Sequence, residues 1–205
     1  MFVLIEGADA SGKTTTIQSL SDHVSANPEE FANKKLMHIK SPSGVFGPLA
    51  RDINLNEDID PLTKFYFFRA AIQHDTFNIK QALNSGCLVI GERYIYTTEA
   101  YHCTLDDLQP DSQNMSHHVN KDQTLKPDLM FMLDMPEETQ IERLKRKWEE
   151  QTVWWEGLEF QQKFARKLRS ICENEKMTVI CTSKHAPDKV VNIIAQAIKS
   201  KLGRQ

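Results

Sequence analysis

The chain has 205 residues and a formal net charge of -3, with 25 basic and 28 acidic side chains. Hydrophobic residues make up 40% of it and charged residues 26%, a balance that excludes disordered, collagen-like and coiled-coil proteins. No apolar run approaches the roughly 18 residues that a membrane span needs, and the near-neutral charge argues against a polymeric nucleic-acid partner.

The first predicted element is a strand at residues 2–5, followed at once by a glycine-containing turn. From Gly7 to Thr14 the turn fits the phosphate-loop pattern G-x-x-x-x-G-K-[ST], and an apolar stripe predicts a helix after it. In such a loop backbone N–H groups face a polyphosphate, and the following helix adds its positive end. We therefore expect nucleotide binding by Gly7, Ala8, Asp9, Ala10, Ser11, Gly12, Lys13, Thr14 and Thr15.

Two side chains of this loop carry specific expectations. Lys13 would reach the β- and γ-phosphates, and the Thr14 hydroxyl would be a ligand of Mg²⁺. The alternative is a turn that fits the pattern by chance. Because the strand starts at residue 2 and the four cysteines show no C-x-x-C spacing, we expect no signal peptide and a reducing, cytoplasmic location.

Further along the chain, strands alternate with helices. Continuously apolar runs, typical of parallel strands covered on both faces, occur at 36–39, 87–90, 129–133 and 178–181. Helices are predicted at 63–84, 136–150, 158–175 and 187–202. This order predicts one α/β domain over 1–205, a P-loop NTPase fold in which helices flank a doubly wound, five-stranded parallel sheet in a three-layer sandwich.

The third strand runs into Gly91, Glu92, Arg93 and Tyr94. A carboxylate and a guanidinium at a strand end beside a phosphate loop suit phosphoryl transfer: Glu92 would orient Mg²⁺ through water, and Arg93 would hold a phosphate with two hydrogen bonds. The alternative is a surface ion pair that contributes less than about 1 kcal/mol.

Two other clusters of polar residues each allow two interpretations. The basic cluster at 143–147 is either a solvated helix face or a lid that brings cations to the transferred phosphoryl group. Residues 102–126 hold few apolar residues and are predicted as a loop with a short helix. The histidines there fit no usual zinc spacing, so we expect them to be exposed rather than metal-bound.

Together these segments resemble the thymidylate kinase family of nucleoside monophosphate kinases over nearly the whole chain. Residues 7–15 are similar to its phosphate loop, 89–94 to its Asp-Arg-Tyr motif, and 126–136 to its Pro-Asp-Leu strand and Leu-Asp-x-Pro turn. The resemblance implies a homodimeric enzyme that uses ATP and Mg²⁺ to phosphorylate a pyrimidine deoxynucleoside monophosphate, with dTMP as the leading candidate.

The resemblance also implies roles on the acceptor side. Asp9 would contact the sugar 3'-hydroxyl or the metal shell, and Arg93 would bind the acceptor phosphate. Thr97 would lie near the base, and Tyr101 would lie beneath the sugar and disfavour a 2'-hydroxyl. Glu92 would stand where the family has an aspartate near Mg²⁺.

On the donor side the resemblance implies a lid at about 143–157, from which Arg143 and Lys147 face the adenosine and its phosphates. Some family members carry a catalytic arginine in the phosphate loop, at the position of Ala10. The missing cation would then come from Lys145, Arg146 or Lys147. We expect the catalytic residues to be Asp9, Lys13, Arg93 and Arg146.

Two departures from the family affect base recognition. Counting back from Gly86 puts Phe67 at the position where the family has a base-stacking aromatic, and Ala71 at the position of its base-reading arginine. Phe65 and Arg69 have the same spacing but lie two residues earlier in the chain, which on a helix is a rotation of about 200° away from the site. The Lys-Ser-Pro run at 40–42 is similar to the mitochondrial UMP–CMP kinase branch, and phosphate binding there would fall to Lys40 or Arg51. Phosphorylation of UMP, CMP or a modified dUMP stays an alternative, as does a catalytically silent nucleotide-binding module.

Overall fold

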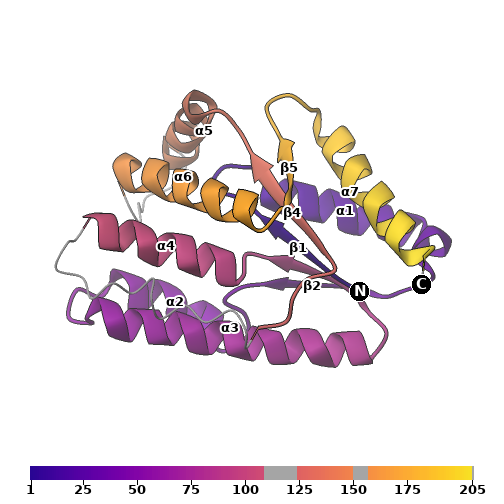
Figure 1. The fold of residues 1–205 in the computed structure, drawn as a ribbon, viewed down its shortest axis with the longest axis horizontal. Coiled ribbons are helices and arrows are strands. Elements are labelled where there is room, and N and C mark those ends of the chain that lie inside the picture. Colours follow the sequence, from indigo (N-terminus) through magenta and orange to yellow (C-terminus); the bar gives the residue numbers. More distant parts are fainter. Residues whose placement is uncertain (109–123, 150–156, 205) are drawn as a thin grey trace.

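Five parallel strands form the central layer of the computed structural model, which describes residues 1–108, 124–149 and 157–204 (Figure 1). Their order in the sheet is β2-β3-β1-β4-β5. The strands are β1 (Phe2–Glu6), β2 (Leu36–Lys40), β3 (Leu88–Glu92), β4 (Leu129–Asp134) and β5 (Thr178–Cys181). The chain leaves β1 toward β2 and later returns to pair β4 on its other side, so the carboxyl end of β1 is the switch point where ligands bind in such sheets.

Helices cover both faces of the sheet because successive side chains of each strand point to opposite sides. Val3 and Ile5 belong to a core shared with α1 (Lys13–Ala26), the short 3-10 helix η1 (Pro28–Phe31) and α7 (Pro187–Leu202). Phe2 and Leu4 belong to the opposite core. This second core is shared with α3 (Pro61–Asn84), α4 (Ile95–Leu108) and α6 (Leu158–Asn174). The three-layer, doubly wound prediction is confirmed.

The five strands and five helices expected from the sequence are present, and the predicted ends differ from the observed ones by at most two residues. The helix α3 begins at Pro61 because the Asp60 carboxylate accepts hydrogen bonds from the N–H groups of Leu62 and Thr63, both at 3.0 Å. The helix predicted at 136–150 is α5 (Glu137–Glu149).

Two helices were not predicted. They are α2 (Phe46–Leu55), which packs near α3 at the bottom of Figure 1, and α4. Of the segment predicted as a loop with a short helix, residues 102–108 are helical and continue α4, while 109–123 lie outside the described residues.

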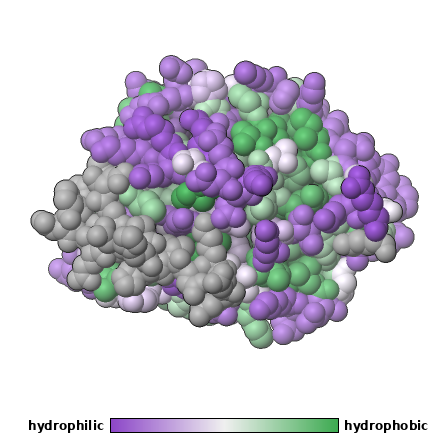
Figure 2. Space-filling model, in the orientation of Figure 1, coloured by the Kyte–Doolittle hydropathy of each residue, from purple (hydrophilic) through white to green (hydrophobic). Residues whose placement is uncertain are grey.

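The surface seen in Figure 2 is largely hydrophilic, with separate patches of apolar residues. Across the described ranges, no helix combines the length and the hydrophobicity that crossing a bilayer requires.

Candidate active site

The loop between β1 and α1 is shaped by two glycines. Gly7 has a φ of +155°, and a Cβ there would lie 2.6 Å from both the Leu133 carbonyl oxygen and Ser11 Oγ, so no side chain fits. Gly12, at φ +88°, occupies the left-handed region directly before α1. These conformations allow the chain to turn tightly from the strand into the helix, as the phosphate-loop pattern predicts.

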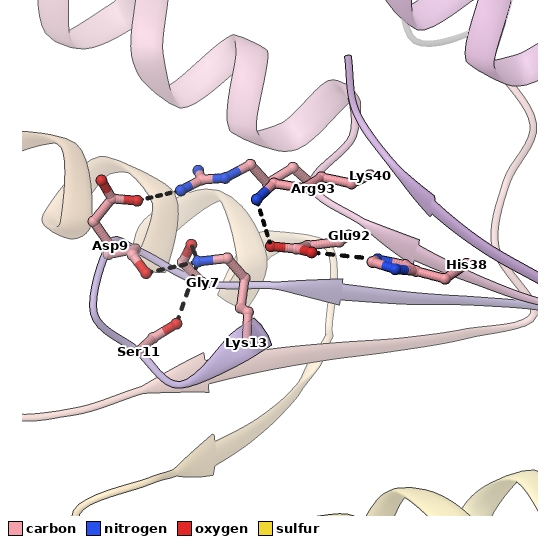
Figure 3. A network of polar contacts seen from close by, with 9 residues as sticks. Gly7, Asp9, Ser11, Lys13, His38, Lys40, Glu92 and Arg93 are labelled. Carbon is pink, nitrogen blue, oxygen red and sulfur yellow. Dashed lines mark hydrogen bonds and ion pairs between the residues drawn. The ribbon is translucent and has the colours of Figure 1, made fainter. Parts of the chain in front are cut away.

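Lys13 curls back over this loop (Figure 3). Its Nζ donates hydrogen bonds to the carbonyl oxygens of Gly7, at 2.7 Å, and Ala8, at 2.8 Å, and lies 3.4 Å from Ser11 Oγ. Only 5% of the residue is exposed. Burial, together with the nearby charge of Arg93, lowers the pKa of the Lys13 ammonium to about 7. An anion entering the loop therefore finds a poorly solvated cation already positioned beside it.

Thr14 and Thr15 lie in the first turn of α1 and are exposed, so their side chains are accessible to a ligand. Among the residues that the structure describes, no group of three or more His, Cys, Asp or Glu side chains could hold a metal ion. The Thr14 hydroxyl instead suits a cation whose other ligands are phosphate oxygens and water, which is how Mg²⁺ is usually bound beside nucleotides.

Arg93 and Asp9 form an ion pair across the mouth of the loop (Figure 3). Arg93 adopts a φ of +62°, an uncommon conformation for a residue with a side chain, directly after β3. Burial opposes ionisation of Asp9, but the charge of Arg93, aided by Lys13 and Lys147, outweighs it and lowers the pKa of the carboxyl to about 2. Asp9 is therefore ionised at neutral pH, and its contact with Arg93 joins the phosphate loop to the end of β3.

Glu92 is buried and faces the edge strand β2. Its Oε2 lies 3.3 Å from His38 Nε2, and its Oε1 lies 3.6 Å from Lys40 Nζ. Burial alone would raise the pKa of Glu92, but the hydrogen bond from His38 and the charge of Lys40 outweigh it and lower this pKa. Glu92 is thus an ionised group at the strand end, with each carboxylate oxygen near a group of β2.

A cavity of about 380 Å³ opens beside this network. Its charged residues are Asp9, Lys40, Arg93 and Lys147. The rest of its lining comes from α2, α3, α4, α6, the residue just before α4 and the segment after β2: Ser41, Pro42, Ala50, Asn54, Phe68, Ala71, Ile72, Tyr94, Thr97, Thr98, Tyr101, Phe160, Gln161 and Phe164. The cavity therefore has a charged region near the phosphate loop and uncharged walls formed by the helices.

Several predicted acceptor-site residues lie together in this lining: Asp9, Lys40, Arg93, Thr97 and Tyr101. Arg51 belongs to α2, but its side chain lies outside what the structure describes. No motif in the sequence points to Asn54 or Gln161, which are polar residues on helices.

Of the aromatic residues on α3, Phe68 is in the cavity lining and the expected Phe67 is not. The Phe67 ring lies 5.6 Å, centroid to centroid, from that of Phe46. Successive residues of a helix point about 100° apart, so an error of one position in counting back from Gly86 is enough to choose Phe67 in place of Phe68. One turn after Phe68 stands Ile72, and Ala71 lies beside it, so neither position carries a base-reading arginine.

The described part of the expected lid, residues 143–149, is the end of α5, and 150–156 lie outside the described residues. Arg143 Nη1 lies 3.4 Å from the Ala10 carbonyl oxygen and 3.2 Å from Thr182 Oγ1, so it links the phosphate loop to the segment after β5. Lys147 lines the cavity. By contrast, the Arg146 side chain is 69% exposed and pairs with Glu142 at 3.0 Å.

The structure also contradicts the expectation that all loop histidines are exposed. His102 is buried in α4, with its ring 4.9 Å from that of Phe65. His117 and His118 lie outside the described residues.

Comparison with known proteins places these features in context. A family model described as thymidylate kinase matches residues 5–194. Thymidylate kinase of Mesoplasma florum is 31% identical over 212 residues, which cover 98% of this chain and 96% of that protein. That of Mycoplasma genitalium is 30% identical over 150 residues, 72% of this chain and 69% of that protein.

The solved structure of thymidylate kinase from Candida albicans, which its description credits with broad substrate specificity, superposes with a TM-score of 0.73. The two chains are 21% identical in sequence, and the match covers 100% of this chain and 93% of the Candida albicans chain. The similarity is therefore one of fold.

Proposed function

This chain belongs to the thymidylate kinase family, and on that premise we propose that it transfers the γ-phosphoryl group of ATP to dTMP, giving ADP and dTDP. The observation that carries the proposal is the position of Lys13, Arg93 and Asp9. They join the phosphate loop to one wall of a cavity large enough for a nucleotide.

The protein's contribution to the reaction is positioning and neutralisation of charge. On ATP binding, the Lys13 ammonium exchanges its contacts with the Gly7 and Ala8 carbonyl oxygens for phosphate oxygens, with the first N–H groups of α1 beside it. Arg93 holds the acceptor phosphate from the other side, so that donor and acceptor meet at the carboxyl end of β1.

A lid cation completes the charge balance because Ala10 supplies none. We assign this role to Lys147, which lines the cavity and whose charge contributes to lowering the pKa of Asp9. Arg146 is less suited, since its guanidinium is exposed and paired within α5.

Mg²⁺ would be held by the Thr14 hydroxyl together with the phosphates of ATP, and would supply further neutralisation of phosphate charge. The ionised Glu92 stands nearby at the end of β3 and would act on that ion only through water, because His38 and Lys40 already occupy its two oxygens.

The acceptor nucleoside would lie against the helices. Phe68 offers the ring on which a base stacks, Thr97 and Thr98 offer hydroxyl groups, and Tyr101 lies farther along α4. This arrangement supports a pyrimidine monophosphate in the cavity.

The assembly and compartment that we propose are a homodimer in the cytoplasm. On α3, the side chains of Tyr66 and Phe77 are exposed by 54% and 57%, which leaves apolar surface available for a second copy of the chain. The reducing cytoplasm suits the four cysteines, all of which lie in the described ranges and none of which forms a disulfide.

A direct test is ATP-dependent phosphorylation of dTMP by the wild-type protein and by Lys13→Ala. We expect the variant to lose at least about a hundredfold in kcat while keeping its circular dichroism spectrum. Lys201→Ala, an exposed position on α7, serves as the matched control. Wild-type-like turnover by Lys13→Ala would contradict the proposed function, as would a wild-type protein that binds ATP and phosphorylates no monophosphate.

A further inference from the structure

Where described residues form them, the helical walls of the cavity carry polar but uncharged side chains, and the inference drawn from this rests on the proposed function. At its helical walls the described lining offers two neutral amides, Asn54 from α2 and Gln161 from α6, next to Ala71 and Ile72. A guanidinium only donates hydrogen bonds, whereas an amide both donates and accepts them. An amide in place of a guanidinium therefore changes which base edges can form hydrogen bonds with the wall of the cavity.

Asn54 is held in place by Tyr101, whose hydroxyl lies 2.9 Å from Asn54 Oδ1. Tyr101 stands six residues into α4, roughly 9 Å of helix rise beyond Ile95 and hence beyond the Arg93 end of the cavity. The Tyr101 ring also packs against Phe160 of α6, with centroids 5.0 Å apart. The amide of Asn54 is therefore oriented by a packed neighbour whose position on α4 lies beyond the Arg93 end of the cavity.

We infer that Asn54, positioned by Tyr101, reads position 4 of the acceptor base and accepts both 4-oxo and 4-amino pyrimidines. A 4-oxo pyrimidine presents an acceptor, O4, beside a donor, N3–H. A 4-amino pyrimidine presents the reverse, a donor amino group beside the acceptor N3. A carboxamide matches either edge with two hydrogen bonds, once it is turned by 180° about its last side-chain torsion.

Tyr101 allows this turn at little cost because its hydroxyl both donates and accepts. With Oδ1 toward Tyr101, the hydroxyl donates to it, as the 2.9 Å contact shows. With Nδ2 toward Tyr101, the hydroxyl oxygen accepts instead. In both orientations the Asn54 amide and the Tyr101 hydroxyl keep a hydrogen bond to each other.

The experiment compares dUMP and dCMP, which differ only at position 4 and N3, with dTMP as the reference for the proposed function. For the wild-type protein we expect kcat/KM values for dUMP and dCMP within about tenfold of each other, since each pairs fully with Asn54. Turnover of dTMP and dUMP with dCMP lower by a thousandfold or more would overturn the inference and leave the proposed function standing. Turnover of no monophosphate would overturn both.

Asn54→Asp tests the residue itself. A carboxylate only accepts hydrogen bonds, so it pairs with the 4-amino group and repels O4. We expect the ratio of kcat/KM for dCMP to that for dUMP to rise by tenfold or more, mainly through KM. Asn56→Asp adds the same charge at an exposed position just after α2 and should leave the ratio unchanged.

A second variant, Asn54→Leu, covers the case in which Asn54→Asp does not fold. It removes both hydrogen bonds, and we expect KM to rise for dUMP and dCMP alike, by about tenfold, with kcat little changed. An unaltered ratio in Asn54→Asp, or unaltered KM values in Asn54→Leu, would show that Asn54 does not read the base.

Discussion

Thr97 Oγ1 donates a hydrogen bond to Glu6 Oε2 across 2.6 Å, and this contact ties the strand that enters the phosphate loop to the helix that walls the acceptor cavity. Glu6 is fully buried at the end of β1, and its other oxygen, Oε1, has no hydrogen-bond partner within the described residues. Burial raises the pKa of the Glu6 carboxyl above its ordinary value of 4.5. The folded protein therefore binds a proton at this site more tightly than the unfolded chain does.

The raised pKa predicts how Glu6→Gln changes stability with pH. Wild-type stability falls as pH rises above about 4.5 toward the folded-state pKa, by up to about 1.4 kcal/mol per pH unit, because the unfolded chain releases the proton first. Glutamine keeps an acceptor for Thr97 and has no proton to lose. Urea unfolding at pH 5 and pH 8 should show the variant gaining stability on the wild type as pH rises. Glu29→Gln, at an exposed site in η1, should show no such trend, and a parallel trend in both variants would contradict the assignment to Glu6.

Lys147 is predicted to be the lid residue that matters for turnover. Lys147→Met keeps a long side chain and removes the charge that faces Asp9 and Arg93, so we expect kcat for dTMP to fall about a hundredfold. Arg146→Met, one residue earlier on the same helix, should change kcat less than about threefold because its guanidinium is exposed. Steady-state assays of both variants decide between them, and a larger loss in Arg146→Met would return the role to Arg146.

Ala10→Arg is expected to restore turnover in the Lys147→Met background. Ala10 already adopts a left-handed φ of +64° and is half-buried, so the backbone strain of a non-glycine residue is present in the wild type and an added side chain can reach solvent. We expect the double variant to regain at least tenfold in kcat over Lys147→Met. If kcat does not recover in a folded double variant, an arginine at position 10 cannot take over the role proposed for Lys147.

Tyr101→Ala should relax discrimination against ribonucleotides. With the ring removed from the wall of the cavity, a 2'-hydroxyl gains room, and we expect the ratio of kcat/KM for UMP to that for dUMP to rise about tenfold. Using one base for both substrates separates this effect from the loss of the hydrogen bond to Asn54. A constant ratio would remove the sugar-discriminating role of Tyr101.

Most of the fold could be predicted from the sequence because buried parallel strands are continuously apolar and glycines mark the phosphate loop. The rotation of single helical residues could not be predicted as well. Phe68 lines the cavity where Phe67 was expected, and the lid cation that we propose is Lys147 where Arg146 was expected, in each case a difference of one position or about 100° of helix. Asn54 could not be found because α2, short and of mixed composition, was not predicted at all.

The phosphate loop makes two separate contacts: Asp9 pairs with Arg93 on the side of the proposed acceptor site, and the Ala10 carbonyl oxygen lies near Arg143 on the side of the proposed lid. A ligand that orders this loop on one side also orders the loop residues that contact the ligand on the other side. Donor and acceptor should accordingly bind with coupled affinities. The factor by which a non-hydrolysable ATP analogue tightens dTMP must then equal the factor by which dTMP tightens the analogue.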